Sequence, residues 1–211
     1  MCTGLSLITE DGAPIFGRTM EFGSDVLEFQ LIASPDGKAY KGHTKDGYDG
    51  MDWTADHSFV SASPSKFLSP TEGVNDAGLQ VGVFFFMPFE KARFQDPDPE
   101  RLTETISSWQ LPSLLLGKAS SVEHAKTLLK DTLVVDSVPS PATEGWEFEP
   151  LIHFAINDVT GASIVVEYLH GELHIFDNPP GTITNQPEFS WHQQNLKLFT
   201  SLPIDQTPPL P

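Results

Sequence analysis

Hydrophobic and polar residues alternate along much of this chain, a pattern typical of β-strands that are buried on one face. Strands are expected at 2–9, 14–22, 26–33, 57–61, 79–86, 153–157, 163–168 and 172–176. The turn-rich stretch 73–78 would connect two of them, and residues 34–52 and 89–100 are expected to be loops. The pattern therefore predicts antiparallel sheets joined largely by turns.

Apolar residues with helical spacing occur in three places. Residues 111–116 and 122–129 show it, and Ser121 is a suitable N-cap for the second segment. Residues 191–199 form a third candidate helix, which the prolines between 203 and 211 cannot continue. With strands at both ends and helices in the middle, we expect an α+β fold and one domain over residues 1–211.

Composition narrows the function classes. Hydrophobic residues make up 39 % of the 211 positions, enough for a sizeable core, and the net charge is −17. A polyanion repels nucleic acid and anionic membrane surfaces, so neither is expected as a partner. The most apolar run, 81–86, is too short to span a bilayer, and the N-terminus has no basic signal-peptide region. These features predict a cytoplasmic protein.

The single cysteine, Cys2, directly follows the initiator methionine. One cysteine excludes an internal disulfide and a multi-cysteine metal site. Removal of Met1 would give Cys2 a free α-amine, which can accept the thiol proton near neutral pH and activate the residue as a nucleophile. The alternative is that Cys2 is only a small N-terminal residue.

Asp11 and Gly12 predict a tight turn between the first two strands. A two-residue loop there would place Cys2 opposite Glu21, whereas a slip of two or three residues would bring Arg18 close instead. A guanidinium can stabilise a thiolate, and a carboxylate can position the ammonium group. The alternative reading of Arg18 and Glu21 is a surface ion pair of little energetic value.

Five motifs, in order along the chain, resemble the choloylglycine hydrolase family, which includes bile salt hydrolases and penicillin V acylases. They are Met1-Cys2-Thr3, Phe16-Gly17-Arg18-Thr19-Met20-Glu21-Phe22, Glu72-Gly73-Val74-Asn75-Asp76-Ala77-Gly78-Leu79, Asp177-Asn178-Pro179-Pro180-Gly181 and Ile183-Thr184-Asn185-Gln186-Pro187-Glu188-Phe189-Ser190-Trp191-His192. Each motif is weak alone. Their shared order and the position of Cys2 make the resemblance specific.

The resemblance implies a four-layer αββα sandwich of the N-terminal-nucleophile class, a homo-oligomer, and hydrolysis of linear amides without metal or cofactor. Cys2 would be nucleophile and, through its amine, general base. Arg18 and Glu21 would position and polarise it, and Asn185 would hold the oxyanion together with backbone N–H groups. Met20, Phe22 and Phe85 are the expected substrate contacts; they are carried over from the family and line an apolar pocket.

Three features depart from the family pattern. Position 21 is Glu where better-known members have Asp, and Phe85 stands where bile salt hydrolases have Asn and some penicillin V acylases have Tyr. The 211 residues also correspond to only the N-terminal two thirds of the family length. A phenylalanine cannot donate a hydrogen bond, so the pocket is expected to be more apolar.

We therefore predict hydrolysis of a small-molecule amide through a thioester acyl-enzyme, with a penicillin V acylase-like or other acyl-amide substrate. Conjugated bile salts and N-acyl homoserine lactones are the alternative substrates. An inactive ligand-binding relative or fragment is the alternative of another class.

Overall fold

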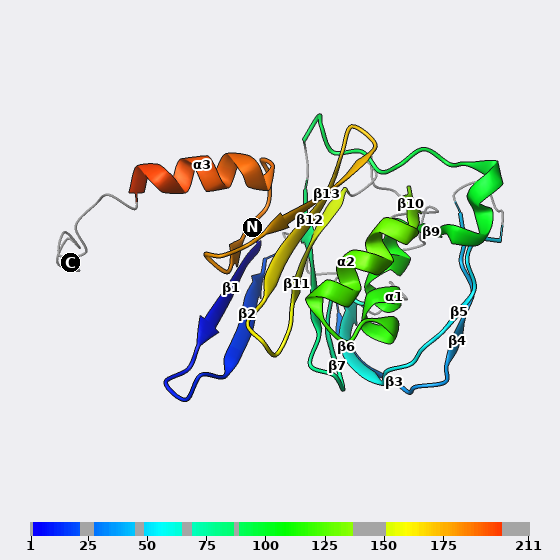
Figure 1. Cartoon of the computed structure of the whole chain (residues 1–211), viewed down its shortest axis with the longest axis horizontal. Helices are drawn as coiled ribbons and strands as arrows, with labels where there is room; N and C mark the ends of the chain where they lie inside the picture. Colours follow the sequence, from blue (N-terminus) through cyan, green and yellow to red (C-terminus); the bar gives the residue numbers. More distant parts are fainter. Residues whose placement is uncertain are drawn as a thin grey trace.

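The computed structural model describes residues 2–21, 28–44, 49–64, 69–86, 89–136 and 151–199. Its centre is a seven-stranded antiparallel sheet (Figure 1). The strands, in spatial order, are β13 (Glu172–Asp177), β12 (Ser163–Leu169), β11 (Ile152–Asn157), β8 (Gln80–Phe85), β7 (Glu72–Asn75), β6 (Phe59–Pro64) and β3 (Phe29–Ser34).

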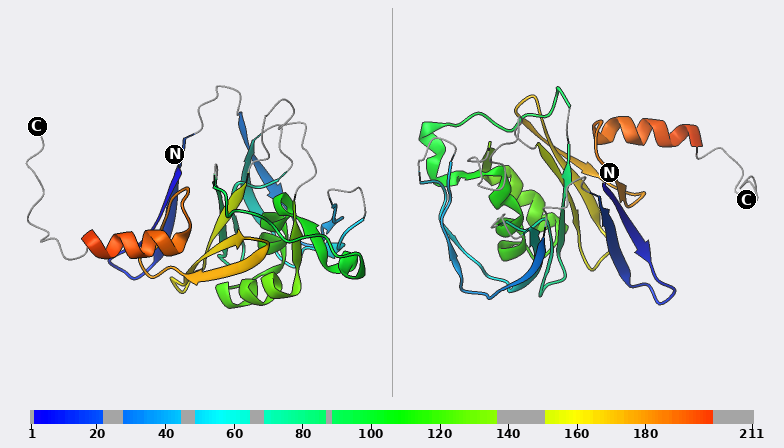
Figure 2. Two further views of the ribbon diagram at one scale, coloured as in Figure 1. Left: turned by 90° about the horizontal axis from the view of Figure 1, so that it is seen from above. Right: turned by 180° about the vertical axis from the view of Figure 1, so that it is seen from behind.

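A second, three-stranded antiparallel sheet packs on one face of the large sheet. Its strands lie in the order β14 (Thr182–Ile183), β1 (Cys2–Ile8) and β2 (Pro14–Met20). Helices α1 (Leu111–Lys118) and α2 (Val122–Asp131) cover the opposite face, and α3 (Phe189–Phe199) lies beside the small sheet (Figures 1 and 2). The described residues thus form three layers in the order helix, sheet, sheet.

Short elements complete the described chain. They are β4 (Ala39–Tyr40), β5 (Trp53–Thr54), β9 (Thr105–Ser107), β10 (Leu133–Val135) and the 3-10 helices Pro99–Glu104 and Ser108–Gln110. None of the helices in the described ranges is long and apolar enough to cross a membrane.

The alternation of side chains on β8 divides the interior into two clusters. Val81 and Val83 join the large cluster on the helix side, together with α1 and α2. Phe84 points to the other side and joins a smaller cluster with Cys2, between the two sheets. Because β8 is buried on both faces, it is a continuous apolar run and not an alternating one.

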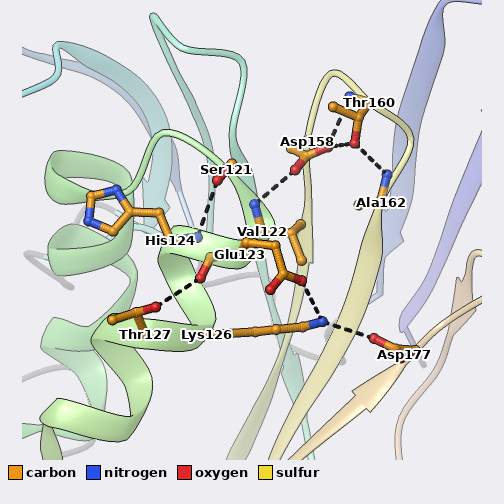
Figure 3. Close-up of polar contacts among 10 residues, drawn as sticks. All are labelled: Ser121, Val122, Glu123, His124, Lys126, Thr127, Asp158, Thr160, Ala162 and Asp177. Carbon is orange, nitrogen blue, oxygen red and sulfur yellow. Dashed lines mark hydrogen bonds and ion pairs between the residues drawn. The ribbon is translucent and has the colours of Figure 1, made fainter.

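Polar contacts fix α2 on the large sheet (Figure 3). The Asp158 carboxylate, in the turn between β11 and β12, accepts a hydrogen bond from the Val122 N–H at 2.8 Å. Ser121 caps the same helix through the His124 N–H, as expected from the sequence. Lys126 bridges Glu123 at 2.8 Å and Asp177 at 3.1 Å, so the helix is tied to the β11–β12 turn and to the end of β13.

Asn75, the last residue of β7, is buried, and its side chain anchors the turn that follows. Its Nδ2 donates to the carbonyl groups of Leu116 (2.9 Å) and Ala119 (2.7 Å), and its Oδ1 accepts from the Leu79 N–H (2.8 Å). The first two bonds join the β7–β8 turn to the C-terminal end of α1, whose last carbonyl groups have no partner within the helix, and the third closes the turn itself.

The α+β class and the antiparallel pairing within the two main sheets are confirmed. The short strands β9 and β10, which pair in parallel, were not predicted, and three predictions differ in detail. The stretch expected as a connection at 73–78 contains most of β7, which pairs with β6 and β8. The loop expected at 34–52 contains β4, which pairs with β5. The third helix begins at Phe189, two residues before the predicted start at Trp191, because the Glu188 carbonyl accepts a hydrogen bond from the Trp191 N–H.

Candidate active site

The first hairpin places Cys2 and Arg18 on one face. The turn has three residues, 10–12, with the Thr9 N–H bonded to the Ala13 carbonyl at 2.9 Å and Gly12 at φ 87°. This is a three-residue hairpin loop with a glycine in the left-handed region of backbone conformation. The sequence predicts a two-residue loop. The pairing therefore shifts by one: Cys2 faces Met20, and Gly4 faces Arg18. The predicted pairing of Cys2 with Glu21 is wrong.

The Cys2 face of the hairpin packs closely on β8 at Gly4. A Cβ atom at Gly4 would lie 2.7 Å from Ile183 Cγ2 and 2.8 Å from Phe84 Cζ. Only glycine allows this approach. Cys2 itself is 2 % exposed and packs in an apolar cluster with Phe84, Ala155, Val165, Ile183 and Phe189.

Arg18 enters the gap between the sheets, and its side chain is 6 % exposed. Its Nη1 donates to the Val83 carbonyl, and its guanidinium carbon lies 4.0 Å from the centroid of the Phe84 ring. Nη1 also lies 3.6 Å from Glu72 Oε2. The cation is thus held by a carbonyl, an aromatic face and a carboxylate.

Glu72 contributes that carboxylate from β7. Burial raises its pKa to about 7, against the opposing effect of the Arg18 charge. The side chain as a whole is 27 % exposed, but Oε2 is buried and has no hydrogen-bond donor among the described residues. Desolvation of this oxygen explains why the nearby cation does not keep the carboxyl pKa low.

Asn185 follows β14 and meets Cys2 directly. Its Oδ1 accepts from the Cys2 backbone N–H at 2.6 Å, and its Nδ2 donates to the Phe85 carbonyl at 2.6 Å. Because an N–H only donates and a carbonyl only accepts, these partners define which end of the amide is oxygen. Thr184 adds a bond from its hydroxyl to the Cys2 carbonyl at 2.9 Å.

A buried carboxylate supports the segment that carries Asn185. Glu167, fully buried on β12, accepts the Phe189 N–H at the start of α3 with both oxygens, at 2.9 and 3.1 Å. Its Oε1 also lies 3.1 Å from His153 Nδ1. From α3, the His192 ring approaches the Asn185 carbonyl at 3.2 Å. The loop between β14 and α3 is therefore held at both ends.

The structure brings together four of the predicted site residues: Cys2, Arg18, Met20 and Asn185. Glu21 follows β2, is exposed, and does not lie opposite Cys2. The Phe85 side chain packs against the cluster on the helix side, because alternation along β8 turns Phe84 and not Phe85 toward Cys2. Phe85 reaches the site through its carbonyl group. Phe22 lies outside the described residues.

Two carboxylates in the site were missed by the sequence analysis. Glu167 stands within the apolar run Ile164-Val165-Val166-Glu167-Tyr168-Leu169, and a charge in such a run is a signal of a buried, partnered group. Glu72 carries no such signal, because it stands outside an apolar run and directly precedes the stretch 73–78, which the pattern predicts to be a connection between strands.

Comparison with known proteins shows the family to which the chain belongs. Residues 2–210 match the family described as linear amide C-N hydrolases, choloylglycine hydrolase family. The chain belongs to the choloylglycine hydrolase family. The bile salt hydrolase/transferase of Clostridium perfringens is 31 % identical over 99 % of this chain and 60 % of its own.

Solved structures of choloylglycine hydrolase relatives share the fold. The C2A variant of conjugated bile acid hydrolase from Clostridium perfringens aligns with a TM-score of 0.78 and 29 % identity over 99 % of this chain. Penicillin V acylase from Agrobacterium tumefaciens aligns with a TM-score of 0.77 and 25 % identity over 96 %. The chain spans 60 % and 58 % of those two structures, respectively. The fold is thus that of the N-terminal-nucleophile hydrolases of this family.

Proposed function

We propose that this protein hydrolyses linear amides, with the Cys2 thiol as nucleophile. The observation that carries the proposal is the meeting of three groups from distant parts of the chain. Cys2 and Arg18 share the inner face of the first hairpin, and Asn185 is hydrogen-bonded to the Cys2 nitrogen. A nucleophile, a cation and an amide group in one buried gap are suited to acyl transfer.

The base in this proposal is the α-amine of Cys2, formed when Met1 is removed. The Cys2 nitrogen lies 2.6 Å from Asn185 Oδ1, so the same oxygen would orient the free amine. The reference pKa values of an α-amine, about 7.7–8.0, and of a thiol, about 8.5, allow proton transfer between them near neutral pH.

The thiolate attacks the amide carbonyl carbon and forms a tetrahedral oxyanion. Asn185 Nδ2 carries two hydrogens, of which one is bonded to the Phe85 carbonyl, so the second can stabilise the oxyanion. The ammonium of Cys2 then protonates the leaving nitrogen as the C–N bond breaks. Water attacks the thioester, the amine takes the water proton, and the thiol is released with the acid product.

Aromatic side chains surround Cys2 and favour a substrate with an apolar acyl group. Phe84 and Phe189 are buried beside it, and Phe16 and Phe176 pack against the same cluster. This supports a penicillin V acylase-like or other acyl-amide substrate, with N-acyl homoserine lactones as an alternative. Conjugated bile salts are the second candidate, because several relatives bear the names bile salt hydrolase or conjugated bile acid hydrolase.

The test is intact-mass analysis of the purified protein before and after incubation with penicillin V, bile salts and acyl lactones. We expect loss of Met1 and product release from at least one amide, together with an acyl adduct that disappears in Cys2→Ala. Arg18→Lys retains the charge without the forked geometry and should react more slowly. Retained Met1, or no product from any member of the panel, would favour the ligand-binding relative.

A further inference from the structure

Glu72 lies in the gap between the sheets, on the same side of the large sheet as Phe84 and Cys2. It pairs with Gly82 across β7 and β8. A Cβ atom at Gly82 would lie 3.0 Å from Glu72 Oε2 and 3.2 Å from Phe84 Cε2. The absence of a side chain at Gly82 leaves the space in which the carboxylate crosses β8 toward Arg18.

Arg18 arrives at the same place from the other sheet. Its contacts with the Val83 carbonyl and the Phe84 ring hold the guanidinium above β8, 3.6 Å from Glu72 Oε2. Its charge lowers the pKa of Glu72, against the larger opposite effect of burial. Glu72 in turn is an acidic partner of Arg18 in this gap.

We propose that Glu72 is a positioning residue that acts through Arg18: when ionised, its carboxylate offsets the charge that the guanidinium presents to Cys2. This rests on the proposed function, in which the positive charge of Arg18 favours the thiolate. Glu72 would then set how much of that charge the nucleophile experiences.

The protonation of Glu72 supports this role. Burial raises its pKa to about 7, so the carboxyl group changes charge around neutral pH. An ionised Glu72 neutralises part of the Arg18 charge, whereas a protonated Glu72 leaves the cation at full strength. The net charge of the Arg18–Glu72 pair thus changes close to the pH range in which an α-amine and a thiol exchange a proton.

The test is the titration of Cys2, followed by the ultraviolet absorbance of the thiolate and corrected with a Cys2→Ala version of each variant. The chain has one cysteine, so the signal is unambiguous. We expect Glu72→Gln to move the midpoint to lower pH by about half a unit or more, because a negative charge is removed while Arg18 keeps its contacts with the Val83 carbonyl and the Phe84 ring.

An Arg18→Gln background shows whether Glu72 acts through Arg18. Without the cation, the buried carboxyl group stays protonated, and Glu72→Gln should then leave the midpoint unchanged. An unchanged midpoint in the wild-type background, a midpoint at higher pH, or an equal shift in both backgrounds overturns the proposal.

Two further variants guard against loss of folding. Gly82→Ala crowds the Glu72 carboxylate without removing it and should shift the midpoint in the same direction by a smaller amount. Asp158→Asn removes a carboxylate that holds α2, so it should lower the melting temperature and leave the midpoint unchanged. The titration needs no substrate, so a shift without amide turnover supports the role of Glu72 and counts against the proposed function alone.

Discussion

Asn185 shows how one side chain can serve two requirements of the proposed reaction. Its oxygen is committed to the Cys2 nitrogen and one amide hydrogen to the Phe85 carbonyl. The remaining hydrogen is the donor for the oxyanion. A change that rotates the Asn185 amide would therefore remove both the bond to the Cys2 nitrogen and the donor to the oxyanion.

Asn185→Ala is expected to lower kcat by about 100- to 1000-fold, equivalent to about 2.7–4 kcal/mol, with a smaller change in KM. The oxyanion exists only during the reaction, so its donor affects the rate more than binding. Steady-state kinetics on the best amide of the panel measures both constants.

Gln194→Ala is the matched control, since Gln194 is an exposed amide on α3. It should leave kcat within about twofold of the wild type. Comparable kcat values for Asn185→Ala and the wild type would refute the role of Asn185.

At the scale of elements, the contact between the first hairpin and β8 depends on one missing Cβ. Gly4→Ala inserts a methyl group 2.7 Å from Ile183 Cγ2 and 2.8 Å from Phe84 Cζ. Overpacking of this kind costs about 1–3 kcal/mol and should also lower activity, because it lifts β1 and Cys2 from their support. Urea unfolding and kcat measure the two effects.

Gly17→Ala in the same hairpin provides the control. A Cβ atom there meets nothing within 4 Å, so the substitution should change the free energy of unfolding by less than about 1 kcal/mol. If the two alanine variants behaved alike, close packing at Gly4 would not be the cause.

The joint between the β7–β8 turn and α1 depends on Asn75. Asn75→Ala leaves two carbonyl groups and one N–H without their buried partners, and should lower the free energy of unfolding by about 2–4 kcal/mol. Chemical denaturation tests this. Asn195→Ala, at a half-buried position on α3, should cost less than about 1 kcal/mol; an equal loss in both would contradict the argument.

For the whole molecule, Glu72 makes stability depend on pH. Its folded pKa of about 7 lies above the ordinary value of 4.5, so the folded state binds more protons than the unfolded state between these values. Stability should therefore fall as pH rises from about 5 to about 8, by up to about 3 kcal/mol. Urea unfolding at both pH values measures the fall.

Glu72→Gln should remove this contribution to the pH dependence. In this variant residue 72 is uncharged at both pH values, so the effect of an unpaired Arg18 on the free energy of unfolding is the same at both. The difference in pH dependence between wild type and variant therefore measures the titration of Glu72. A slope identical to that of the wild type would show that Glu72 titrates at an ordinary pKa.

Much of this fold follows from local patterns. Alternation and turn residues located most of the large sheet, and helical spacing located the three α-helices of the described residues. The pairing in the first hairpin could not be predicted in this way, because Asp11 and Gly12 fit both two- and three-residue turns. A shift of one residue in the pairing changes which residues of the two strands share a face. β7 was missed since its four residues resemble a turn.

The candidate site was predictable only through its motifs. Cys2 and Asn185 are 183 positions apart, and no local periodicity brings them together. The contact between the Glu72 carboxylate and the Arg18 guanidinium requires the space at Gly82 and the burial of the Arg18 side chain. These three residues lie on three strands in two sheets. Such a pair becomes visible only when the tertiary structure is known.

Cys2 occupies the middle strand of the small sheet, between β14 and β2, and is 2 % exposed. A substrate or a thiol reagent therefore reaches the thiol only when the side chains packed around it move apart. Since the chain has a single cysteine, its labelling rate relative to the unfolded chain gives the free energy of that opening. The atom proposed to perform the chemistry thus also reports how often its own surroundings open.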